Sequence, residues 1–194
     1  SGLNILNCHI GYVGIQGGGA AMGLQIWHSD MVVRNNEIHD CGRRSISYNV
    51  YVDNGRHHEG LTFENVRFEN NVLHNGYHTT GFDISHGTGM VDTLRNFTFS
   101  GNFIWDDPAD DTVPPNDFTS MGLYLYAGDA NFTDVTIVNN IVKHPKQKGF
   151  AISDVANLVI ANNTLYGMNP NIDGYRGLHV VDGSTITAPK QTIE

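Results

Sequence analysis

Three large aromatic side chains, Trp27, Tyr124 and Tyr126, stand at alternate positions of short segments that begin with a glycine. The two segments, residues 23–28 and 122–126, place aliphatic side chains at the positions between. Because a β-strand turns successive side chains to opposite faces, the aliphatic residues are expected to point inward and the rings outward. Rings exposed in a row can stack on the apolar faces of sugars. These residues therefore predict a carbohydrate-binding surface.

The same alternation extends the outward surface over six segments of the chain. It predicts a first outward row of Gln25, Ser47, Asp83, Tyr124, Ala151 and His179. It predicts a second outward row of Trp27, Asn49, Ser85, Tyr126, Ser153 and Val181. In the first row Gln25, Asp83 and His179 could hydrogen-bond to sugar hydroxyl groups. The alternative is that the loops at 52–60 and 105–121 fold over the rings and bury them.

A catalytic interpretation starts from Asp83 and His86, which leave the same predicted strand. The histidines expected in the flanking loops are His57, His58, His74 and His78. A carboxylate beside imidazoles can perform acid–base catalysis near neutral pH. Glycoside hydrolysis usually needs two facing carboxylates, whereas the row supplies Ser47 and Tyr124 beside Asp83. No catalytic set is therefore firm, and the histidines show no zinc-ligand spacing.

Four aspartates in the longest loop, Asp106, Asp107, Asp110 and Asp111, could hold calcium through clustered carboxylates. The run lacks the spacing of an EF-hand, and acidic loops are often simply solvated, so it is a weak metal candidate. No other cofactor is expected.

The elements that would position these residues are repeats built around an asparagine turn. Aligned on the second asparagine of the turn, the copies fall at Cys8, Asn36, Asn71, Asn102, Asn140 and Asn163. A bulky apolar residue stands three and five positions before each of these sites, and another stands two positions after it. Asparagine tolerates left-handed backbone angles, and stacked amides can hydrogen-bond along the stacking axis. The repeats therefore predict stacked coils of short strands.

We predict an all-β fold, a right-handed parallel β-helix of about six coils, as a single domain over residues 1–194. Successive copies lie 28, 35, 31, 38 and 23 residues apart, so the shortest approximates a bare coil and the surplus forms loops. A β-sandwich is disfavoured because its strands have no reason to keep asparagine in register. The first repeat begins at residue 3 without a capping helix, and residues 192–194 look like the start of another coil. Since solenoids cover their ends, we expect a longer parent polypeptide.

The charge balance restricts the partners. The chain carries 11 Lys and Arg against 20 Asp and Glu, a formal net charge of -9. This balance argues against nucleic acid and against unaided binding of polyuronates. A neutral partner, or an acidic one bridged by calcium, fits better. No apolar run is long enough to span a bilayer and no signal peptide is evident, so no membrane partner is expected.

The two cysteines, Cys8 and Cys41, take different positions relative to the repeat. These positions do not stack, so a disulfide can form but is not indicated.

The repeated Val-x-x-Asn-Asn-x-Ile pattern, with strands such as Gly23-Leu24-Gln25-Ile26-Trp27, resembles the pectate-lyase-like superfamily of right-handed parallel β-helices. The resemblance covers nearly all of the chain, but its motifs specify fold rather than activity. Most members of that superfamily act on carbohydrates. A minority are binding modules joined to plant-wall enzymes such as xylanases. No catalytic set of these families matches the sequence residue by residue.

The resemblance and the residues together favour a non-catalytic module that binds a neutral plant cell-wall polysaccharide such as xylan. Such a module is expected to be linked covalently to a catalytic domain and to be secreted, or otherwise extracellular, in a bacterium. The alternative is a polysaccharide lyase or glycoside hydrolase with its site around Asp83 and His86. A structural segment of a larger fibre or adhesin is a third, weaker alternative.

Overall fold

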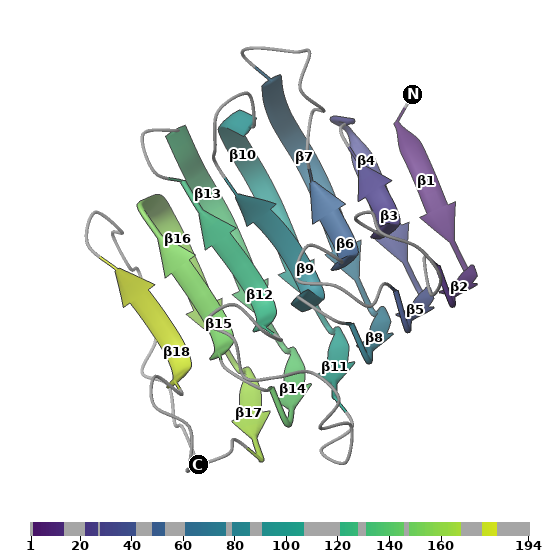
Figure 1. Ribbon diagram of the computed structural model, residues 1–194. Coiled ribbons are helices and arrows are strands. Elements are labelled where there is room, and N and C mark those ends of the chain that lie inside the picture. The colour runs from purple at the N-terminus through teal and green to yellow at the C-terminus, as the bar shows by residue number, and fades with distance from the viewer. Residues whose placement is uncertain are drawn as a thin grey trace.

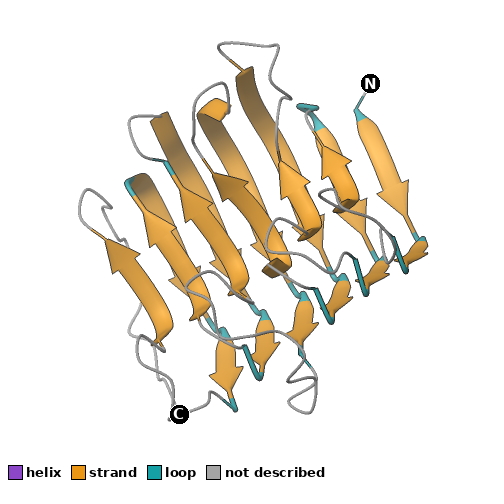
Figure 2. Cartoon of the chain, viewed as in Figure 1, coloured by secondary structure: helices purple, strands orange, loops and turns teal. Residues whose placement is uncertain are grey.

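The computed structural model describes residues 2–13, 22–26, 28–41, 48–52, 61–76, 79–85, 91–106, 121–127, 131–145, 148–167 and 176–181. The strands in these ranges (Figure 1) are β1 (Leu3–Leu6), β2 (His9–Gly11), β3 (Met22–Ile26), β4 (Met31–Arg34), β5 (Glu37–His39), β6 (Tyr48–Val52), β7 (Leu61–Glu69), β8 (Val72–His74), β9 (Thr79–Ser85), β10 (Val91–Ser100), β11 (Phe103–Trp105), β12 (Met121–Tyr126), β13 (Asn131–Val138), β14 (Ile141–Lys143), β15 (Lys148–Ser153), β16 (Val155–Ala161), β17 (Thr164–Tyr166) and β18 (Arg176–Val181). In this part of the chain no helix is long and apolar enough to cross a membrane (Figure 2).

The strands form three parallel sheets, and each turn of the chain contributes one strand to every sheet. Sheet A has the order β1-β4-β7-β10-β13-β16. Sheet B has the order β2-β5-β8-β11-β14-β17, and sheet C has the order β3-β6-β9-β12-β15-β18. The chain therefore climbs through six stacked coils, from β1 at one end to β18 at the other (Figure 1). This arrangement is a parallel β-helix, which confirms the predicted fold class.

Apolar side chains of successive coils stack in columns inside the coils. In sheet A the register aligns Val33, Phe68, Phe99, Ile137 and Ile160, and each of them is at most 1% exposed. The rings of Phe68 and Phe99 stack with their centroids 5.5 Å apart and their planes within 8°. Full burial of one such side chain contributes roughly 1.5–3 kcal/mol. Because one coil cannot bury its own inner face, this contribution exists only when neighbouring coils stack.

The corner between sheets A and B explains why asparagine recurs. Its first residue adopts a left-handed backbone, with a φ of 57° at Asn35. Its second residue is buried, and its amide enters a ladder along the axis. The side chain of Asn36 donates to Asn71 Oδ1 at 3.0 Å, and that of Asn71 donates to Asn102 Oδ1 at 3.1 Å. The ladder then continues through Asn140 and Asn163. The predicted axial hydrogen bonding is confirmed. The first corner residue supplies the left-handed backbone, and the second supplies the buried amide of the ladder.

The segment predicted to supply Ser47 and Asn49 to the outward rows, residues 45–49, is wrong in its register. The observed strand is β6, whose Val50 pairs with Leu24 on one side and Phe82 on the other. Ile46 and Val50 lie on the same side of one alternation, so alternation alone does not tell which of them pairs with Leu24. Val50 is fully buried in the core column, a position that suits a β-branched side chain. The demand for a filled core therefore selects the later register.

This shift changes the predicted outward rows. Tyr51 takes the place in the first row that was predicted for Ser47, and Ser47 lies outside the described residues. Asn49 does not belong to the second row, because it is buried and donates to the backbone oxygen of His74 at 2.9 Å. The first row thus has an aromatic residue in place of a polar one, and the second row loses a polar residue.

Both cysteines carry free thiols. Cys8 is exposed at the ladder position of the first coil, and its backbone nitrogen donates to Asn36 Oδ1 at 2.9 Å. Cys41 is fully buried. Burial raises the pKa of the Cys41 thiol to about 11, and the negative charge of Asp40 acts in the same direction.

Candidate functional site

The outer face of sheet C is the first candidate site, because the strand register brings the predicted polar and aromatic residues into rows. The first row contains Gln25, Tyr51, Asp83, Tyr124, Ala151 and His179. The second row contains Ser85, Tyr126, Ser153 and Val181. Apart from the replacement of Ser47 by Tyr51, the first row has the predicted composition. Five of the six predicted segments therefore meet in the predicted register.

Exposure varies along the first row. Gln25 is exposed and Tyr124 is half-buried. Between them Tyr51 is 5% exposed and Asp83 is 2% exposed, although strand alternation turns both to the outer face. The row is therefore covered at its middle and open beside it. The loops that were predicted to cover the rings lie, apart from their ends, outside the described residues, so that alternative stays a prediction.

Tyr124 and Tyr126 are two residues apart on β12 and share its outer face. Their rings are parallel within 6°, with centroids 6.2 Å apart, and Tyr126 is 41% exposed. Burial raises the pKa of Tyr124 to about 12, with smaller contributions from the negative charges of Asp83 and Tyr126. The Tyr124 hydroxyl therefore keeps its proton at neutral pH and can act as a hydrogen-bond donor.

A comparison with family models completes this description. Residues 23–193 match the model described as a right-handed β-helix region. The chain belongs to the right-handed β-helix family. The three parallel sheets and the asparagine ladder are thus those of a right-handed β-helix, as predicted. No curated protein and no solved structure matched this β-helix. Assignment to the pectate-lyase-like superfamily stays a prediction.

Several predicted site residues of the β-helix lie outside the described residues or have no described side chain. Trp27 and His86 lie outside the described residues, and His179 belongs to β18 without a described side chain. Asp106 is described and is 2% exposed, whereas the other three aspartates lie outside the described residues: Asp107, Asp110 and Asp111. The calcium site in that loop therefore stays a prediction.

Sequence reasoning missed a second group of side chains in the β-helix. His39 and His74 end β5 and β8 in sheet B, and Asp40 follows His39 at the corner. His74 had been predicted in a loop beside Asp83, and this prediction is wrong because β8 ends on it. Each histidine stands three positions after its ladder asparagine, so the repeat count would have found the pair.

Proposed function

We propose that the outer face of sheet C binds a carbohydrate, with Tyr124 and Tyr126 as its stacking platform. The observation that carries this proposal is the parallel pair of tyrosine rings on one outer strand face, with Tyr126 41% exposed. A ring with an accessible face can lie against the apolar face of a pyranose. The protonated hydroxyl of Tyr124 supplies a donor for a sugar oxygen beside the stacked ring.

An extended ligand fits this surface better than a single sugar. Gln25 is exposed in the same row and lies three strands from Tyr124 along the coil axis. Three strand spacings correspond to about 14 Å. A polymer long enough to span the covered middle of the row, where Tyr51 and Asp83 are buried, would contact the tyrosine pair and reach the amide of Gln25. This arrangement is compatible with a linear polysaccharide.

The charge of the chain supports a neutral polymer. With a formal net charge of -9, the surface repels a polyanion on average, whereas a neutral plant-wall polysaccharide such as xylan meets no such barrier. In this proposal the β-helix is the binding module of a secreted bacterial enzyme and is joined to its catalytic domain. Trp27 lies outside the described residues, and we predict that it adds one more ring to this platform.

The test is binding of soluble xylan, measured by affinity electrophoresis and titration calorimetry. We expect Tyr126→Ala to weaken binding about tenfold, the effect of losing one stacking contact. Tyr166→Ala is a matched control because Tyr166 is also 41% exposed but lies on sheet B. Unchanged binding in Tyr126→Ala, or an equal loss in Tyr166→Ala, would contradict the proposal.

Cleavage of the polymer is the second candidate. It is favoured by Asp83, a carboxylate on the outer face that is only 2% exposed and influences the pKa of Tyr124. Buried carboxylates beside proton donors are typical of acid–base sites. The same binding assay is therefore scored for new reducing ends and for unsaturated products that absorb ultraviolet light. Product release that disappears in Asp83→Asn would establish an enzyme, and binding without product supports the module.

A further inference from the structure

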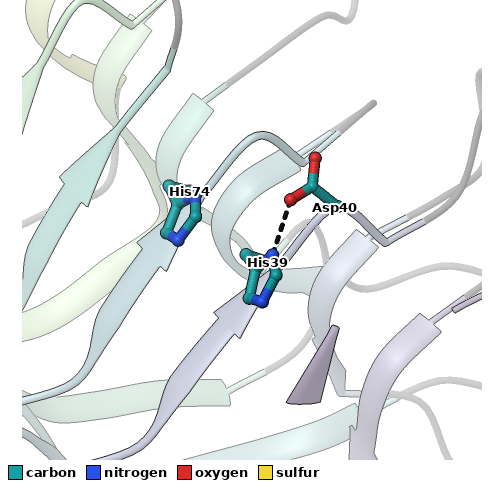
Figure 3. A group of neighbouring side chains, drawn as sticks. All are labelled: His39, Asp40 and His74. Carbon is teal, nitrogen blue, oxygen red and sulfur yellow. Dashed lines mark hydrogen bonds and ion pairs between the residues drawn. The ribbon is translucent and has the colours of Figure 1, made fainter. Parts of the chain in front are cut away.

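The outer face of sheet B carries a cluster of imidazoles that the carbohydrate proposal does not use. The register places Gly11, His39 and His74 side by side on successive coils. The rings of His39 and His74 stack with centroids 4.7 Å apart and planes within 6° (Figure 3). Gly11 leaves the space that His39 occupies, since a Cβ atom there would lie 2.4 Å from His39 Nε2. The first coil therefore accommodates this ring.

Asp40 is folded back onto His39 by the corner. Its backbone is left-handed, with a φ of 49°, and its Oδ2 lies 2.5 Å from His39 Nδ1 (Figure 3). His39 is 5% exposed, whereas the side chain of Asp40 is 33% exposed. The pair thus joins a buried imidazole to a carboxylate that solvent can reach.

His74 has one nitrogen held by a carboxylate and one without a partner. Its Nε2 lies 3.2 Å from Glu37 Oε1, and this hydrogen bond is the largest cause of the lowered pKa of Glu37. A carboxylate that accepts from Nε2–H leaves the lone pair of the neutral ring on Nδ1. Among the described residues no hydrogen-bond partner reaches Nδ1, which is buried. This nitrogen is therefore oriented as a ligand by its neighbour, the arrangement that metal-binding histidines usually have.

We infer that His39, Asp40 and His74 form a binding site for a divalent transition-metal ion of the zinc type. One ring nitrogen from each histidine and one carboxylate oxygen lie within 4.8 Å of one another. Two imidazoles and a carboxylate suit zinc and its neighbours, whereas calcium and magnesium prefer oxygen ligands only. Three protein ligands would leave a fourth position of a tetrahedral ion for water.

The distances define the adjustment that the ion requires. Ligands of a tetrahedral zinc ion with bonds of 2.0–2.1 Å lie about 3.3 Å apart. In the structure, His39 Nδ1 and Asp40 Oδ2 are 2.5 Å apart, which is closer than this value. The three ligand atoms all lie within 4.8 Å of one another, which is an upper limit above it. Because the two rings are stacked within 6°, their lone pairs run parallel, so binding requires one ring to rotate out of the stack and the Asp40 carboxylate to turn toward the ion. The ion would then replace the hydrogen bond that His39 Nδ1 donates to Asp40 and would satisfy His74 Nδ1.

Binding must also remove the proton that His39 Nδ1 donates to Asp40, because only a lone pair ligates the ion. The His39 Nε2 atom lies 2.5 Å from His9 Nε2, so this neighbour can accept when the tautomer of His39 changes. The other titratable side chains in contact with the two rings are Glu37, which bonds to His74, and Tyr12, whose ring packs edge-on against His39 with centroids 5.1 Å apart.

The experiment is calorimetric titration of the chelator-treated full chain with zinc chloride near neutral pH. We expect one ion per chain, with at least about 100-fold weaker binding in Asp40→Asn and in His74→Phe. Asparagine tolerates the left-handed corner, and phenylalanine keeps the ring that stacks against His39 and against Trp105, whose centroid lies 4.6 Å from that of His74. Circular dichroism and thermal melting check that both variants keep the fold.

His28→Ala is the matched control, because His28 is an exposed histidine outside the cluster whose Nδ1 lies 2.8 Å from the adjacent backbone oxygen of Ser29. The His28→Ala variant is expected to bind zinc with the affinity of the unsubstituted protein. Absence of zinc binding, an equal loss in His28→Ala, or full affinity in folded His74→Phe would overturn the inference. Since xylan binding is measured separately at sheet C, failure of either proposal leaves the other testable.

Discussion

The amide oxygen of Asn71 accepts two hydrogen bonds from Asn36, one from the backbone nitrogen and one from Nδ2, both at 3.0 Å. The two residues are 35 positions apart in sequence yet occupy the same corner of adjacent coils. Asn71 in turn donates through Nδ2 to the backbone oxygen of Val33 and to the next ladder asparagine. The side chain is fully buried, so each of these bonds forms without competition from water.

Substitution of Asn71 by leucine is expected to lower the free energy of unfolding by about 3 kcal/mol or more. Leucine has a similar size but leaves the backbone nitrogen of Asn36 and the oxygen of Val33 buried without partners. Urea denaturation followed by circular dichroism measures the change. Asn70→Gly is the control, because Asn70 is exposed at a left-handed φ of 53° that glycine adopts freely, and its effect should stay within about 1 kcal/mol. Equal effects of the two substitutions would contradict an energetic role for the ladder.

The ladder also shows why so much of the fold was predictable. Each repeat contains the same corner, so the position of its asparagine determines which residues on both sides of it point inward. The predicted ladder sites from Asn36 to Asn163 all occupy the ladder, and Cys8 holds its end through its backbone nitrogen. Because the repeats can be aligned, this single sequence indicated which distant residues pair with each other in the fold.

The parts that were not predictable lack such repetition. β6 follows a segment with no asparagine signal, and two registers of one alternation compete there until the core column selects Val50. The cluster of His39 and His74 was missed for another reason. Its residues are distant in sequence and no short motif links them, so the pair emerges only when the positions after successive ladder asparagines are compared, as the register of sheet B shows.

The two thiols are expected to differ sharply in reactivity. Cys41 is fully buried and its pKa is raised to about 11, so near pH 8 it stays protonated and inaccessible. Cys8 is exposed. A chromogenic disulfide reagent should therefore titrate one thiol rapidly in the folded chain and two in denaturant. Cys8→Ser should abolish the rapid phase, and a rapid phase that persists in this variant would contradict the burial of Cys41.

Tyr124 is expected to make the fold sensitive to alkali. Its pKa is raised to about 12 in the folded chain, whereas an unfolded tyrosine ionises near about pH 10. The folded state thus holds the phenolic proton more tightly. The corresponding stability is fully present below about pH 10 and is lost as the pH rises through the folded pKa. Tyr124→Phe should flatten the fall of the melting temperature over this interval, and an unchanged alkaline slope would contradict the assignment.

On the outer face of sheet A, Glu69 joins two arginines from adjacent coils. Arg34 contacts Glu69 Oε2 through Nε and Nη2, both at 2.8 Å, and Arg67 contacts Oε1 at 2.8 and 2.7 Å. The side chain of Glu69 is 12% exposed, so solvent screens these charges less than those of a surface pair. Removal of the carboxylate leaves two guanidinium groups near each other without a counter-charge.

We therefore expect Glu69→Gln to lower the free energy of unfolding by about 2 kcal/mol, between the values typical of exposed and buried pairs. Glu64→Gln is the comparison, since Glu64 is 33% exposed and contacts the single guanidinium of Arg95 at 3.1 Å. Its effect should stay below about 1 kcal/mol. Urea denaturation at low and high salt measures both variants. The difference between them should shrink in high salt as the arginine repulsion is screened, whereas a salt-independent difference would point to packing rather than charge.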